Sequence, residues 1–175
     1  MKKLVYRRQA LVDAFKGKDD LGVVIRSHII VEQYLNDIIE SVLLCPEKYR
    51  KEINLDYFDK VRFSVAIGLN ERFEGALKAL GTLRNGFAHN IRSEISKQDT
   101  NNIYAALDPE RKKTVQGLFE NIKSKNHNLS FPAYRDLVPK DKYLLYIITL
   151  SGALEIATEE LPGKSKCSES IPGGV

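Results

Sequence analysis

Apolar residues recur along most of the chain at spacings of three and four, which places them on one face of an α-helix. Alternating runs typical of strands are scarce. The pattern predicts helices over about residues 2–15, 21–44, 57–69, 71–91, 109–123 and 140–160. We therefore expect an all-α protein, a bundle of about five to six helices.

The ends of these helices carry familiar signals. Asp19 or Asp20 can cap the second helix, and Asp108 followed by Pro109 favours the start of the fifth. The remaining stretches have no helical periodicity and are expected to be connectors: 47–56, 92–102 and 124–139.

The length of 175 residues fits one domain. We expect residues 1–160 to form it, and residues 161–175, which contain prolines and glycines, to form a flexible C-terminal tail. No run of about 18 apolar residues occurs and no signal-peptide pattern follows the basic start, so a cytoplasmic protein without a membrane span is expected. Cys45 and Cys167 form no CxxC pair, which favours two reduced thiols.

The net charge of +4 makes the chain mildly basic. A basic chain is compatible with a polyanionic partner such as RNA, because neutralising phosphates supplies much of the affinity for nucleic acids. Many proteins that bind no nucleic acid are equally basic, so charge alone does not decide between the classes.

The fourth predicted helix holds an arginine inside its apolar stripe. The stripe consists of Phe73, Leu77, Leu80, Arg84, Phe87 and Ile91. A guanidinium in apolar surroundings costs several kcal/mol unless it is paired or hydrogen-bonded. Either the bundle opens into a cleft at Arg84, or an acid of the second helix meets it. The candidate acids are Glu32, Asp37 and Glu40.

His89 follows Arg84 by five residues, which places it roughly 140° around a regular helix. Its face also holds Gly75, Thr82 and Gly86. Two glycines on one face suggest that another helix or a ligand comes close. A second copy of the chain, related by twofold symmetry, could bring two Arg–His pairs together. Alternatively, the arginine is an ordinary paired core residue and the histidine stabilises the helix C-terminus.

A row of polar side chains interrupts the apolar stripe of the second helix. His28, Glu32 and Asn36 follow one another at spacings of four, and Arg26 lies close by in sequence. His28, Glu32 and Arg26 could line the same cleft as Arg84. Alternatively, His28 is a core histidine hydrogen-bonded beside Glu32.

The stretch 84–89, Arg-Asn-Gly-Phe-Ala-His, resembles the Arg-x4–6-His signature of HEPN ribonucleases. Together with 55–61, 66–69 and 80–85, it is similar to the mannitol-repressor (MltR-like) family, which shares an Arg-Asn-x-Phe-Ala-His segment. The resemblance covers roughly Asp19 to Lys125 and implies a HEPN-like helical bundle.

The resemblance implies a dimeric, metal-independent endoribonuclease with both motifs in a cleft at the interface. His89 would act as general base or acid on the 2′-hydroxyl or the leaving oxygen, because histidine ordinarily titrates near physiological pH. Arg84 would hold the scissile phosphate and stabilise the charge of the transition state. Asn85 would orient the histidine or the phosphate, or cap the helix.

The same resemblance implies a toxin of a toxin–antitoxin pair or an anti-phage defence effector. Its partners would be RNA, a second copy of the chain and a cognate antitoxin or regulatory protein. No cofactor is expected, and none of the three histidines has metal-ligand spacing. Two other functions stay open: a non-catalytic MltR-like regulatory or interaction module, and a domain that binds a nucleotide without cleaving it.

Overall fold

A computed structural model describes residues 2–17, 19–89, 92–125 and 132–161, which contain helices, turns and loops but no strand. This part of the chain has eight α-helices, so the all-α class is confirmed and the expected number of five to six was too low. The helices are α1 (Lys2–Phe15), α2 (Asp20–Val42), α3 (Pro46–Glu52), α4 (Tyr57–Ala66), α5 (Glu74–His89), α6 (Lys97–Ala106), α7 (Pro109–Lys125) and α8 (Pro139–Glu160), with 3₁₀ turns at Glu71–Phe73 and Tyr134–Asp136.

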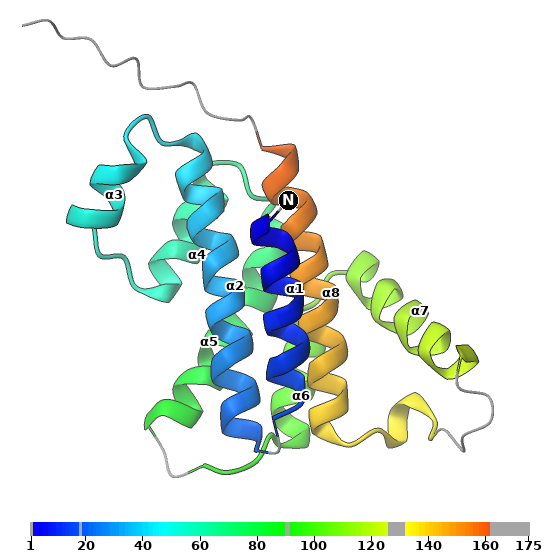
Figure 1. Cartoon of the computed structure of the whole chain (residues 1–175). Coiled ribbons are helices and arrows are strands. Elements are labelled where there is room, and N and C mark those ends of the chain that lie inside the picture. The colour runs from blue at the N-terminus through cyan, green and yellow to red at the C-terminus, as the bar shows by residue number, and fades with distance from the viewer. Residues whose placement is uncertain (1, 18, 90–91, 126–131, 162–175) are drawn as a thin grey trace, which may run out of the picture.

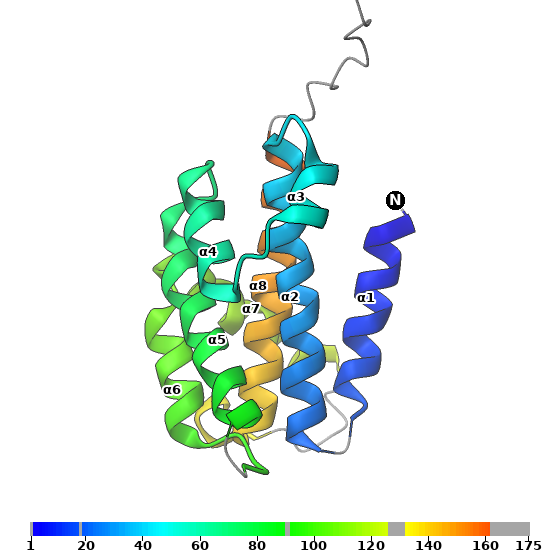
Figure 2. The same cartoon turned by 90° about the vertical axis from the view of Figure 1, so that its left-hand side faces the viewer.

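The helices form three layers. Figure 2 shows α2 and α8 in the middle, α1 on one side of them, and α4, α5 and α6 on the other. Helix α7 packs against α8 and diverges from the bundle towards its far end (Figure 1). Because α1 and α5 lie in the two outer layers, the bundle has two faces separated by α2 and α8.

The core lies between α2, α8 and the layer of α4, α5 and α6. We predicted an apolar stripe along α2 from Val24 to Val42, and most of it is confirmed, since Val24, Val31, Leu35 and Ile38 are buried. Val42, at its C-terminal end, is only half-buried. Helix α8 buries residues around much of its circumference, as expected for a central helix. None of the helices in the described ranges is long and apolar enough to cross a membrane.

Two helices lie where connectors were expected. Pro46, which follows the second predicted helix, occupies the first turn of α3, where its missing N–H costs no hydrogen bond. Helix α6 begins at a capping box in which the Ser96 hydroxyl accepts from the Asp99 N–H and the Asp99 carboxylate accepts from the Ser96 N–H. This Ser-x-x-Asp signal is visible in the sequence.

Helix α5 runs without interruption from Glu74 to His89, through Gly86. It packs closely on α4 at Gly81, where a β-carbon would lie 2.6 Å from Cε1 of Tyr57. The predicted C-terminal tail lies outside the described residues from position 162 onward, as does Ile91 of the expected stripe.

Candidate functional site

Arg84 lies among apolar side chains, as the stripe predicted. Leu77, Leu80 and Phe87 are buried, while Arg84 is half-buried. Its Nη1 donates a hydrogen bond of 3.0 Å to Oδ1 of Asn85. The side-chain amide of Asn85 therefore orients the guanidinium of Arg84. We had expected Asn85 to orient the histidine or the phosphate, or to cap the helix.

The acids that could have met Arg84 each form an ion pair with another cation. These pairs are Glu32 with Lys60 (2.7 Å), Asp37 with Arg7 (2.8 Å) and Glu40 with Arg50 (2.5 Å). Within the described residues, Arg84 has no carboxylate partner. The expected ion pair between Arg84 and an acid of the second helix is therefore not formed. The N–H groups of Arg84 that do not bind Asn85 are left for an external anion.

His28 of α2 lies in the same neighbourhood and is buried, with 3% of its surface exposed. Its ring packs on Tyr57 of α4, with 4.2 Å between the ring centroids. The Tyr57 hydroxyl donates to the backbone oxygen of Leu77 at 2.9 Å, which fixes the tyrosine between α4 and α5. The Nε2 atom of His28 is buried and has no hydrogen-bond partner. His28 is thus a core histidine, as one of the two alternatives expected, but its Nε2 atom lacks the expected hydrogen bond.

Burial lowers the pKa of His28 to about 4. The carboxylate of Glu32 acts in the opposite direction, and the positive charges of Arg84 and Lys60 lower the pKa further. His28 is therefore neutral at neutral pH. Because their charges act on His28, the side chains of Glu32, Lys60 and Arg84 lie within electrostatic range of it. We call these four residues, which α2, α4 and α5 contribute, the Arg84 cluster.

His89 is the last residue of α5 and is exposed. Since the helix is regular through Gly86, the five-residue offset turns His89 roughly 140° away from Arg84. One copy of the chain thus holds Arg84 and Asn85 together but directs His89 towards another face of α5.

The His89 face of α5 meets α6. Gly75 contacts it closely, since a β-carbon there would lie 3.4 Å from the backbone oxygen of Ala106. Nearer to His89, a cavity of about 340 Å³ separates the two helices. Its lining residues are Ala79, Thr82, Leu83, Gly86, Arg92, Asp99 and Asn102. At Gly75 the close helix is therefore α6 of the same chain, whereas a β-carbon at Gly86 would meet only Nη1 of Arg92, at 3.2 Å.

The two other expected site residues, Glu32 and Arg26, lie in different places. Glu32 belongs to the cluster through its ion pair with Lys60. Arg26 is exposed, and because it precedes the buried His28 by two residues, it points roughly 160° away from it around α2. Arg26 is thus not brought beside His28. Sequence reasoning missed Lys60 and Tyr57, whose i, i+3 spacing on one face of α4 was a usable signal.

No group of three or more His, Cys, Asp or Glu side chains in the described ranges could hold a metal ion. No protein-family model matches the sequence, no curated protein is significantly similar to it, and no solved structure significantly resembles its fold.

Proposed function

We propose that the protein is a metal-independent endoribonuclease of the HEPN type, whose site combines Arg84 and Asn85 of one copy with His89 of a second copy. The observation that carries the proposal is the half-buried guanidinium of Arg84, which has an amide to orient it but no carboxylate among the described residues. An arginine held in this way is suited to a phosphate oxygen, which it can bind through two N–H groups.

The reaction requires an anion site and a group that transfers protons. The 2′-oxygen attacks the phosphorus atom and the P–O5′ bond breaks, which yields a 2′,3′-cyclic phosphate and a 5′-hydroxyl. The base takes the proton of the 2′-hydroxyl, and the acid supplies one to the 5′-oxygen. Arg84 stabilises the charge that builds on the phosphoryl oxygens, and His89 carries out one of the two proton transfers.

The position of His89 supports a site shared between two copies. A twofold axis close to the C-terminal end of α5 would place the exposed His89 of each copy next to Arg84 of the other. His28 does not suit the proton-transfer role, because burial keeps it neutral and removes its Nε2 atom from solvent. It supports the neighbouring helices through Tyr57 instead.

The test is cleavage of a mixed panel of single-stranded RNAs in EDTA. We expect Arg84→Leu and His89→Gln each to lower the cleavage rate by about 10²- to 10⁴-fold. Leucine continues the apolar stripe of α5, so the free energy of unfolding of Arg84→Leu should be unchanged or higher by about 1 kcal/mol. Arg62→Ala, which removes an exposed arginine of α4, is the matched control and should cleave as the wild type does.

The proposal is lost if the wild type leaves the whole panel intact, or if both site variants cut at the wild-type rate. If the free energy of unfolding of Arg84→Leu falls far enough to explain the loss of cleavage, Arg84 has only a structural role.

The alternative is a non-catalytic regulatory or interaction module of the MltR-like kind. It is favoured by one observation: a groove of about 750 Å³ lies along α8, on the face opposite α5 and away from Arg84. An inactive wild type in the RNA assay would select this alternative.

A further inference from the structure

The cavity of about 340 Å³ between α5 and α6 lies along the side of α5 that carries His89. Thr82, Gly86 and His89 follow one another at spacings of four and three, which places them on one stripe of the helix. Thr82 and Gly86 line the cavity, and His89 lies about one turn beyond Gly86. A group bound in the cavity would therefore lie close to His89.

The lining of this cavity contains one arginine and one carboxylate, which neutralise each other. Nη2 of Arg92 donates to Oδ2 of Asp99, and the guanidinium lies over the ring of Phe87, with 5.3 Å between its carbon atom and the ring centroid. The other lining side chains are uncharged: Ala79, Thr82, Leu83, Gly86 and Asn102. A neutral polar group suits such a cavity better than a phosphate, which is bound by cations that are free to pair with it.

Two hydrogen-bond acceptors of the lining are left for a ligand. Arg92 and Ser96 donate to Oδ2 of Asp99, so Oδ1 of this carboxylate has no partner among the described residues. The hydroxyl of Thr82 donates its one hydrogen to the backbone oxygen of Lys78 at 3.0 Å, so towards a ligand its oxygen can only accept. The cavity can therefore accept hydrogen bonds from two N–H groups.

A donor stands beside one of these acceptors on α6. Oδ1 of Asn102 accepts from Nε2 of Gln98 at 2.7 Å, which leaves the N–H groups of Nδ2 for a ligand. Asp99 and Asn102 are three residues apart, so they are neighbours on the surface of α6. Thr82 lines the same cavity from α5. Helix α6 thus supplies a donor next to an acceptor, and α5 supplies the second acceptor.

We propose that this cavity binds a guanine base. Guanine carries an acceptor, O6, beside the donor N1–H, and it has a second donor in its 2-amino group. Asn102 would donate to O6, Asp99 would accept from N1–H, and Thr82 would accept from the 2-amino group. Adenine, cytosine and uracil each have donors on one atom of the base only, so each would leave one of the two acceptors without a partner.

In the ribonuclease proposed above, on which this step rests, the guanine would belong to the nucleotide next to the scissile phosphate. Because the cavity lies beside His89, one copy of the chain would supply both the base pocket and the proton transfer. Arg84 of the other copy would hold the phosphate. We therefore expect RNA to be cleaved next to guanosines.

Base selectivity can be measured without cleavage, by isothermal titration calorimetry of the full chain with nucleoside 5′-monophosphates. We expect guanosine monophosphate to bind at least about ten-fold more tightly than the adenosine, cytidine and uridine monophosphates. Inosine monophosphate lacks only the 2-amino group of guanine. It should bind about three- to ten-fold more weakly than guanosine monophosphate, because the hydroxyl of Thr82 then has no donor to accept from.

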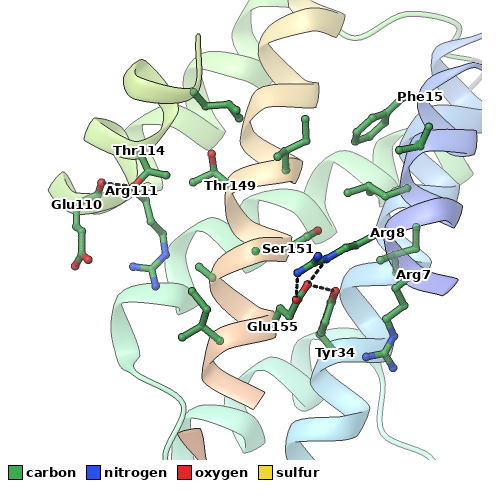
Figure 3. Close-up of a pocket in the computed structure, with 18 residues that line it drawn as sticks. Arg7, Arg8, Phe15, Tyr34, Glu110, Arg111, Thr114, Thr149, Ser151 and Glu155 are labelled. Atoms are coloured by element: carbon green, nitrogen blue, oxygen red, sulfur yellow. Dashed lines mark hydrogen bonds and ion pairs between the residues drawn. The ribbon is translucent and has the colours of Figure 1, made fainter. Parts of the chain in front are cut away.

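Thr82→Val removes this acceptor and keeps the branched shape of the side chain. The variant should bind guanosine and inosine monophosphates equally. Thr114→Val is the matched control, because the exposed Thr114 of α7 also donates to a backbone oxygen four residues before it, that of Glu110 at 3.1 Å. Thr114 lines the groove along α8 instead (Figure 3), so this variant should keep the wild-type preference for guanosine monophosphate.

Three results would each overturn the guanine site, even if the wild type cleaves RNA: no binding of guanosine monophosphate, equal binding of all the nucleotides, or an unchanged preference over inosine monophosphate in Thr82→Val. Selective binding that Thr82→Val removes would support the site even if the wild type cleaves no RNA, and only the ribonuclease function would then be lost. Cleavage of a mixed-sequence RNA next to all four nucleotides alike would overturn the placement of the guanine beside the scissile phosphate.

Discussion

Arginines lie on both faces of the bundle, but their partners differ. On the α1–α7–α8 side, Arg7, Arg8 and Arg111 each have a carboxylate. On the α5 side, Arg84 has only the amide of Asn85 within the described residues. The first three charges are satisfied within the chain. Because Arg84 has no carboxylate among the described residues, an external anion can pair with it, and for this reason we propose that the reaction takes place at Arg84.

Buried polar atoms without a partner lie on both sides of the bundle. On the Arg84 side they are Nε2 of His28 and the hydroxyl of Ser64, and around the groove along α8 they are the hydroxyls of Thr149 and Ser151 and Nε of Arg111. A titratable ring that lacks a partner makes the stability of the Arg84 side depend on pH. Hydroxyl groups do not titrate in this pH range, so they do not make stability depend on pH. The pH dependence of unfolding therefore tests the contribution of His28.

The largest expected effect on stability comes from His28. Its pKa is about 4 in the folded chain and roughly 6.5 in an unfolded one, so the unfolded state binds more protons between these values. The free energy of unfolding should therefore fall as the pH drops from 6.5 to 4, by on the order of 3 kcal/mol from this residue. Urea unfolding at a series of pH values, with His28→Gln as the reference, isolates the contribution.

The variant should lose less stability than the wild type over that pH range. Parallel pH curves for the two proteins would mean that His28 is hydrated in solution, and the α2–α4–α5 side would then be an open cleft rather than a packed interior.

Glycines give the next largest effect, with opposite signs on the two faces. Gly81→Ala would push a methyl group into the ring of Tyr57, 2.6 Å away, and should lower the free energy of unfolding by about 1–3 kcal/mol. Gly152→Ala meets open space within a helix and should raise it by about 0.5–1 kcal/mol. Urea unfolding followed by circular dichroism at pH 7 measures the free energy of unfolding of both variants. If both changes have the same sign, the predicted difference between Gly81 and Gly152 is wrong.

Much of the fold could be predicted from periodicity and caps. The bounds of α1 were predicted correctly, and Asp19 caps α2 as expected, with its side chain accepting from the Gly22 N–H. The short helices α3 and α6 were missed because they bury few residues and so leave a weak apolar pattern. For these, only the signals at their N-termini were informative, Pro46 and the pair Ser96 and Asp99.

The candidate site was predictable only in part. An arginine in an apolar stripe could be recognised as unusual from the sequence alone, and so could the offset of His89. The ion pair of Glu32 with Lys60 and the packing of His28 on Tyr57 join helices that are far apart in sequence. Such contacts depend on tertiary packing, which single-helix patterns do not contain.

The most direct test of the shared site mixes two inactive variants. Arg84→Leu and His89→Gln are combined in equal amounts, allowed to exchange subunits, and assayed for RNA cleavage in EDTA. Half of the dimers should be mixed, and each should hold one intact site out of two, so about a quarter of the wild-type activity should return. A mixture as inactive as either variant alone would contradict a site in which Arg84 of one copy works with His89 of the other.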